Sequence, residues 1–100
     1  MAEPPPADAG PVFGRDVTII NVRGLHARAA KLFVDPARTF QCRITVARDR
    51  QIVDAKDIWD LMTLAAERGM RLRLRAEGPE AQAALEALAA LVAAKFHEGE

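Results

Sequence analysis

Residues 70–80 read Met-Arg-Leu-Arg-Leu-Arg-Ala-Glu-Gly-Pro-Glu, and this stretch decides the fold class. Apolar and charged residues alternate from Met70 to Glu77, which predicts a strand with one buried and one solvated face. The following Gly78-Pro79-Glu80 is typical of a helix start, with Pro79 suited to the first helical position. A half-buried strand that leads into a helix favours an antiparallel sheet with helices on one side only.

The rest of the chain repeats these two patterns. β-Branched or alternating residues predict three further strands, and apolar residues at helical spacing predict two further helices. The order β-α-β-β-α-β-α predicts an α+β open-faced β-sandwich, with a four-stranded antiparallel sheet and three helices on one face. The strands are expected at residues 16–22, 40–47, 51–55 and 70–77, and the helices at 27–36, 58–68 and 79–96.

The chain has the length of one domain. Its 100 residues can build one modest core and are too few for two. Residues 16–97 form the expected domain. Residues 1–15 contain four prolines among small residues, so we expect a disordered tail there. Residues 98–100 are expected to form a short C-terminal tail, with His97 and Glu98 solvated.

The composition argues against several classes of protein. Lys plus Arg and Asp plus Glu both number 14, so no bulk charge favours nucleic acid or an anionic membrane. Cys42 is the only cysteine, which excludes an internal disulfide and a cysteine metal cluster and suits a reducing compartment. There is no apolar run of the roughly 18 residues that a membrane span needs, and the first residues do not resemble a secretory signal. We therefore expect a cytoplasmic protein that uses no metal or cofactor and binds neither nucleic acid nor membrane.

Gly24-Leu25-His26-Ala27-Arg28 places a histidine where a strand ends and a helix begins. A helix N-terminus offers unpaired backbone N–H groups and a partial positive charge, which favour a neutral, nucleophilic imidazole and can hold an anion. We expect a phosphoryl group on His26 to be held by the first-turn residues Ala27, Arg28 and Ala29, with the Arg28 guanidinium compensating its charge. A histidine at such a junction can also be a cap or a surface residue, so the pentapeptide alone leaves both interpretations open.

Three separate stretches show a family resemblance. They are Gly24 to Arg28, the run Ala55-Lys-Asp-Ile-Trp-Asp-Leu-Met62, and Ala76-Glu-Gly78 before the last helix. The first two resemble the active-site motif and the regulatory-serine segment of the histidine-containing phosphocarrier proteins of the bacterial phosphotransferase system, the HPr family, and the third is a supporting match. Ala29 and the ending Val92-Ala-Ala-Lys-Phe96 are more similar to the nitrogen-related branch, NPr, than to the sugar-transport branch.

The resemblance implies a phosphoryl relay. An enzyme I-type protein, charged from phosphoenolpyruvate, would pass its phosphoryl group to Nδ1 of His26, and His26 would pass it to an enzyme IIA-type acceptor. Such a carrier is expected to be a monomer and to need no catalytic machinery beyond His26 and Arg28. Where many family members have proline, this chain has Ala29, which removes a conformational constraint on the first turn.

The second helix is the expected docking surface for both partners. Asp57 stands where some family members have a serine that a kinase modifies, so it is either a helix cap or a fixed charge that tunes partner affinity. Trp59 is equally compatible with the edge of the core and with a partner contact. The expected interface residues are Lys31, Asp57, Ile58, Trp59, Asp60 and Met62.

Two other functions stay open. A regulatory adaptor could share the HPr-like fold without transferring a phosphoryl group, although the histidine argues against it. A small RNA-binding sheet domain is suggested by arginines expected on the solvated sheet face. The polar strand positions offer no aromatic side chain for base stacking, which makes this alternative the weaker one. Those arginines are Arg43, Arg71, Arg73 and Arg75.

Overall fold

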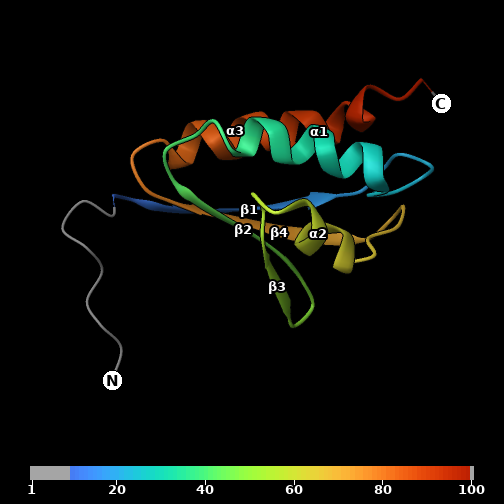
Figure 1. The fold of residues 1–100 in the computed structure, drawn as a ribbon, viewed down its shortest axis with the longest axis horizontal. Helices are drawn as coiled ribbons and strands as arrows, with labels where there is room; N and C mark the ends of the chain where they lie inside the picture. Colours follow the sequence, from blue (N-terminus) through green and yellow to red (C-terminus); the bar gives the residue numbers. More distant parts are fainter. Residues whose placement is uncertain (1–9, 100) are drawn as a thin grey trace.

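The computed structural model describes residues 10–99 and confirms an open four-stranded antiparallel sheet with three helices (Figure 1). The spatial order of the strands is β1-β4-β2-β3, and every neighbouring pair is antiparallel. In chain order, the elements are β1 (Val12–Thr18), α1 (Ala27–Ala37), β2 (Arg43–Arg48), β3 (Gln51–Asp54), α2 (Ile58–Thr63), β4 (Arg71–Glu77), α3 (Ala81–Ala93) and the short 3₁₀ helix η1 (Lys95–His97).

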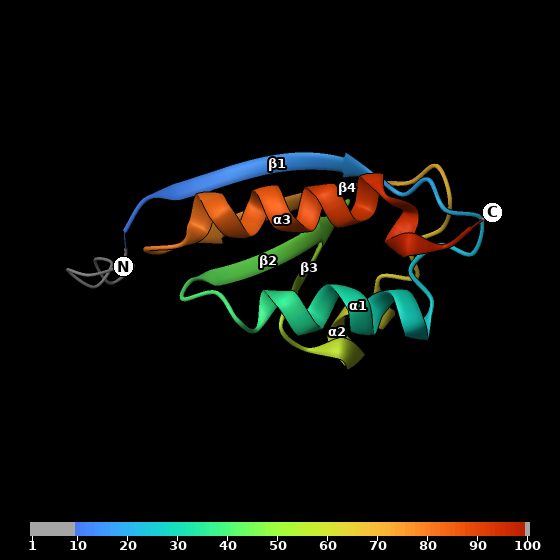
Figure 2. The same cartoon turned by 90° about the horizontal axis from the view of Figure 1, so that it is seen from above.

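Helices α1 and α3 lie over the same face of the sheet, and α2 packs against α1 and β3 (Figures 1 and 2). The alternation in β4 places Leu72, Leu74 and Ala76 in the core and the intervening arginines in solvent. Phe33 of α1 and Leu88 of α3 fill the space above them. No helix within residues 10–99 is long and apolar enough to cross a membrane.

Strand β1 spans Val12–Thr18, whereas the sequence predicted a strand at residues 16–22, so both the predicted start and the predicted end are wrong. Val12 pairs with Glu77 of β4, so residues 12–15 belong to the sheet although they were expected in the tail. The start of β1 is set by backbone pairing with the neighbouring strand β4. The sequence of residues 12–15 has no clear strand pattern, so it could not show this start. Residues 1–9 of the expected tail lie outside the described residues.

The second and third helices are shorter than predicted. Helix α2 ends at Thr63 instead of continuing toward Gly69, because Leu64 and Ala66 turn into the core and Ala65 adopts a left-handed φ of 49°. Arg48 stabilises this exit by donating from Nη1 to the Leu64 carbonyl at 2.6 Å. Helix α3 begins at Ala81, so Pro79 lies before the helix and not at its first position.

Candidate functional site

His26 forms the N-terminal boundary of α1. Its backbone is extended, with φ −75° and ψ 178°, and its carbonyl accepts the Ala30 N–H at 2.8 Å. The N–H groups of Ala27, Arg28 and Ala29 precede this first helical hydrogen bond and are therefore available at the helix end. Ala27 and Arg28 are exposed, whereas the Ala29 side chain is buried in the core, so Ala29 can contribute only its backbone.

The loop before His26 is fixed against the segment that follows α2. Leu25 donates its N–H to the Ala66 carbonyl at 2.9 Å. Gly24 has a φ of +66°, and a Cβ at this position would lie 2.5 Å from the same Ala66 oxygen. Glycine is therefore required by both conformation and space. This close approach sets the position at which the chain enters α1, and with it the position of His26.

A glutamate from the C-terminal segment reaches the imidazole. The Glu98 carboxylate contacts Nε2 of His26 through Oε2, and the same oxygen lies 3.7 Å from Nη2 of Arg28. Asn21 donates from Nδ2 to Oε1 of Glu98 at 2.9 Å and to the Gly24 carbonyl at 2.8 Å. The exposed fraction is 18% for the His26 side chain and 7% for that of Glu98. The imidazole is thus held on one edge and partly open.

The environment of Glu98 favours its ionised form. The Asn21 hydrogen bond, followed by the hydrogen bond with His26, holds the pKa of this carboxyl below its usual range, and Arg28 adds to the effect. The sequence interpretation placed Glu98 in a solvated tail, and this is wrong. The only local signal is the apolar Phe96, which is fully buried and fixes the chain just before Glu98.

Asn21, His26, Arg28 and Glu98 are called the imidazole cluster below. A shallow hollow of about 410 Å³ lies beside it. Arg23 and Arg28 supply two guanidinium groups to its lining, with Glu98 as the acidic member, and Val22 and Gly99 complete it. A second cation beside Arg28 suits an anionic group. Sequence reasoning missed Arg23, because its position in a turn gives no pattern by which to place it.

The expected docking residues of α2 occupy its exposed side and its cap. Asp57 caps the helix by accepting the N–H groups of Trp59 at 2.9 Å and Asp60 at 3.1 Å. The Trp59 side chain is in solvent, with 75% of the residue surface exposed, and Met62 is also exposed. Ile58 is partly buried against the core, and Lys31 on α1 pairs with Asp35 at 2.8 Å.

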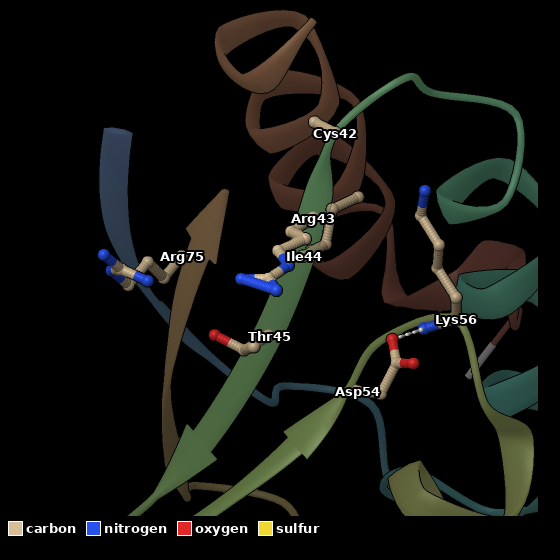
Figure 3. A pocket seen from close by; sticks show the side chains of 7 residues that line it. All are labelled: Cys42, Arg43, Ile44, Thr45, Asp54, Lys56 and Arg75. Atoms are coloured by element: carbon tan, nitrogen blue, oxygen red, sulfur yellow. Dashed lines mark hydrogen bonds between the residues drawn. The ribbon is translucent and has the colours of Figure 1, made fainter. Parts of the chain in front are cut away.

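The opposite sheet face has a separate hollow of about 270 Å³ (Figure 3). Arg43, Thr45 and Arg75 project from the neighbouring strands β2 and β4 there. Lys56, at its rim, donates from Nζ to the Phe40 carbonyl at 2.9 Å. The residues that line this hollow include no aromatic side chain, so it offers no platform for base stacking. They also include none of His26, Arg28 and Glu98, so the hollow is separate from the imidazole.

The fold and the imidazole cluster together define a class of protein. A partly open imidazole beside free helix N–H groups and two guanidinium groups suits a small domain that takes up an anionic group and releases it. Comparison with known proteins gives the family. The family model described as the PTS HPr component phosphorylation site matches residues 13–94.

Named relatives agree with this match. The phosphocarrier protein HPr of Cupriavidus necator is 45% identical over 86 residues, which is 86% of this chain and 97% of that protein. The phosphocarrier protein NPr of Shewanella violacea is 40% identical over 84% of this chain and 92% of its own length. The crystal structure of HPr-C-His from Thermoanaerobacter tengcongensis has a TM-score of 0.85 and 39% identity, and the match covers 88% of this chain and 99% of that one. The chain therefore belongs to the HPr family of phosphocarrier proteins.

Proposed function

We propose that His26 is the residue that accepts and donates the phosphoryl group in this phosphotransferase-system carrier. The family assignment supplies the relay, with an enzyme I-type donor and an enzyme IIA-type acceptor. The observation that supports His26 is that only one of its two ring nitrogens is occupied by a hydrogen bond. Nε2 faces the Glu98 carboxylate, and Nδ1 has no hydrogen-bond partner among residues 10–99. Nδ1 is therefore the nitrogen whose lone pair can attack phosphorus.

The transfer needs little from the protein besides placement and charge. The Nδ1–P bond forms as the donor's bond to phosphorus breaks, and the Nε2 proton stays on the ring. The free N–H groups of Ala27, Arg28 and Ala29 face the incoming charge, and the Arg28 guanidinium can turn toward it because its side chain is 63% exposed. A helix end contributes about 0.3 to 1 kcal/mol to a bound anion. This weak hold suits a carrier, since each 1.4 kcal/mol of extra stabilisation would cost about tenfold in passing the group on.

Partner docking is proposed over α2 and the start of α1. Trp59 and Met62 lie three positions apart on α2 and are both exposed, and exposed aromatic residues are typical anchors of interfaces. Ile58 supports the pair from the core edge. The charged rim consists of Arg28, Lys31, Asp57 and Asp60.

The finer assignments are also proposals. We also propose that the protein is a cytoplasmic monomer, as membership of the HPr family implies. Crh from Bacillus subtilis, 42% identical with a TM-score of 0.68, forms a domain-swapped dimer in its crystal structure, so light scattering in solution is the direct test for this chain. Membership of the nitrogen-related branch remains a prediction from Ala29 and residues 92–96. Phosphorylation with enzyme I donors of both branches tests it.

The deciding experiment is phosphorylation from phosphoenolpyruvate with an enzyme I of either branch. We expect an acid-labile, base-stable phosphoramidate on the wild-type protein and none on His26→Ala, which should still fold because His26 is not part of the hydrophobic core. His97→Ala is the matched control and should be labelled like the wild type. Labelling of His26→Ala would disprove the site. Failure of the wild type with both donors would favour the regulatory adaptor.

A further inference from the structure

The C-terminal segment returns to the start of α1 through an unusual backbone path. Lys95, Phe96 and His97 all have left-handed φ values, of 56°, 53° and 62°, and Phe96 is fully buried between them. This turn reverses the chain after α3 and brings Glu98 beside His26, which lies 72 residues earlier in the sequence. Figure 2 shows the end of the chain next to the loop that precedes α1.

Glu98 is held there by a buried amide. Asn21 has no exposed surface, and its Nδ2 group donates both to the Gly24 carbonyl and to Oε1 of Glu98. One carboxylate oxygen is thus anchored to the loop that positions His26. The other oxygen faces the ring, and an ionised carboxylate can only accept hydrogen bonds, so the hydrogen between the two groups belongs on Nε2.

We propose that Glu98 is a positioning residue for phosphoryl transfer, which keeps the proton on Nε2 of His26 and presents the Nδ1 lone pair at the helix N-terminus. The proposal rests on His26 as the phosphoryl acceptor. A carboxylate that fixes the tautomer and orientation of a reacting imidazole is the arrangement by which hydrolytic triads hold their histidine. Here the reacting nitrogen attacks phosphorus directly instead of removing a proton.

The position of Glu98 also matches the charge that develops during transfer. When the Nδ1–P bond forms and the donor's bond to phosphorus breaks, the ring keeps its Nε2 proton and gains positive charge. The carboxylate contacts the protonated edge of the ring, so it stabilises that charge without lying between Nδ1 and the donor. When the group leaves for the acceptor, the electron pair returns to Nδ1 and the same contact persists.

The test compares Glu98→Ala and Glu98→Gln with the wild type. Nitrogen and proton magnetic resonance of the His26 side chain should show a protected Nε2–H in the wild type, which is lost to rapid exchange with water in Glu98→Ala. In single-turnover transfer from the phosphorylated donor, the maximal rate should fall about tenfold or more, as expected for loss of a charged hydrogen bond. The donor concentration for half-maximal rate should change little. Glu98→Gln keeps an acceptor atom and should recover part of the rate.

Glu86→Ala is the matched control, because Glu86 is an exposed glutamate on α3 outside the cluster. It should leave both the resonance and the rate unchanged. A wild-type maximal rate in Glu98→Ala would overturn the proposal, whether or not the Nε2–H signal is lost. A fall confined to the half-maximal donor concentration would also overturn it, since Glu98 would then be a docking residue. Phosphorylation of His26→Ala would instead refute His26 as the acceptor, so the two failures are distinguishable.

Discussion

At the scale of single residues, the mechanism that we propose assigns bond formation to His26 and charge compensation to Arg28. His26 is held on its Nε2 edge, whereas Arg28 is mostly in solvent and only 3.7 Å from the Glu98 carboxylate. The guanidinium is thus near the reacting ring without being locked in place. A local pattern was enough to propose both residues, because the glycine, the histidine and the arginine of the motif lie within five positions of the chain.

We expect Arg28→Ala to slow phosphoryl transfer in both directions by about ten- to a thousandfold, since removal of one preorganised charge-stabilising group has effects of this size. The free energy of unfolding should change by about 1 kcal/mol at most, because an exposed ion pair at this distance contributes little. Forward and reverse single-turnover rates measure the first effect and urea unfolding the second. Arg68→Ala, at an exposed loop arginine, is the control. Unchanged transfer rates would remove Arg28 from the mechanism.

At the scale of elements, apolar periodicity predicted all four strands and three helices, but neighbours decided where each one ends. Alternation from Met70 to Glu77 corresponds closely to β4, which is one of the two inner strands and has a partner on each side. The length of α2 could not be predicted, because Leu64 and Ala66 continue an apolar helical spacing and still leave the helix. Their burial and the Arg48 hydrogen bond to the Leu64 carbonyl are long-range contacts.

Helix α2 also gives a direct test of the docking surface. We expect Trp59→Ala to weaken binding of both donor and acceptor by roughly 1 to 3 kcal/mol, the range for an aromatic anchor. Stability should hardly change, because 75% of Trp59 is exposed. Ile52→Ala is the matched control, since Ile52 is 68% exposed on β3 and lies outside the proposed interface. Titration calorimetry with both partners decides, and equal affinities for Trp59→Ala and the wild type would show that docking avoids this helix.

At the scale of the whole molecule, the site is assembled from three distant parts of the chain. The loop after β1 supplies Asn21 and Gly24, the start of α1 supplies His26 and Arg28, and the segment after α3 supplies Glu98. No sequence pattern links positions so far apart, and three consecutive left-handed residues before Glu98 are not a pattern that propensity predicts. This is why the helix-end half of the site was predictable and the carboxylate half was not.

This assembly predicts that the contribution of Glu98 to stability depends on pH. The hydrogen bonds from Asn21 and His26, with Arg28 nearby, lower the pKa of Glu98 in the folded protein. A carboxyl with a lowered folded-state pKa stabilises the fold above its unfolded-state pKa, and this contribution is lost as the pH falls through the lowered value.

We therefore expect wild type and Glu98→Gln to differ in free energy of unfolding at neutral pH and to converge in strong acid, measured by urea unfolding from about pH 7 to about pH 2. Glu86→Gln should differ from the wild type by a small amount that lacks this acid convergence, because Glu86 is exposed on α3 and lies outside this cluster. A pH-independent difference for Glu98→Gln would show that the ionised carboxylate does not hold the C-terminal segment to the loop, and that the buried Phe96 side chain is sufficient to do so.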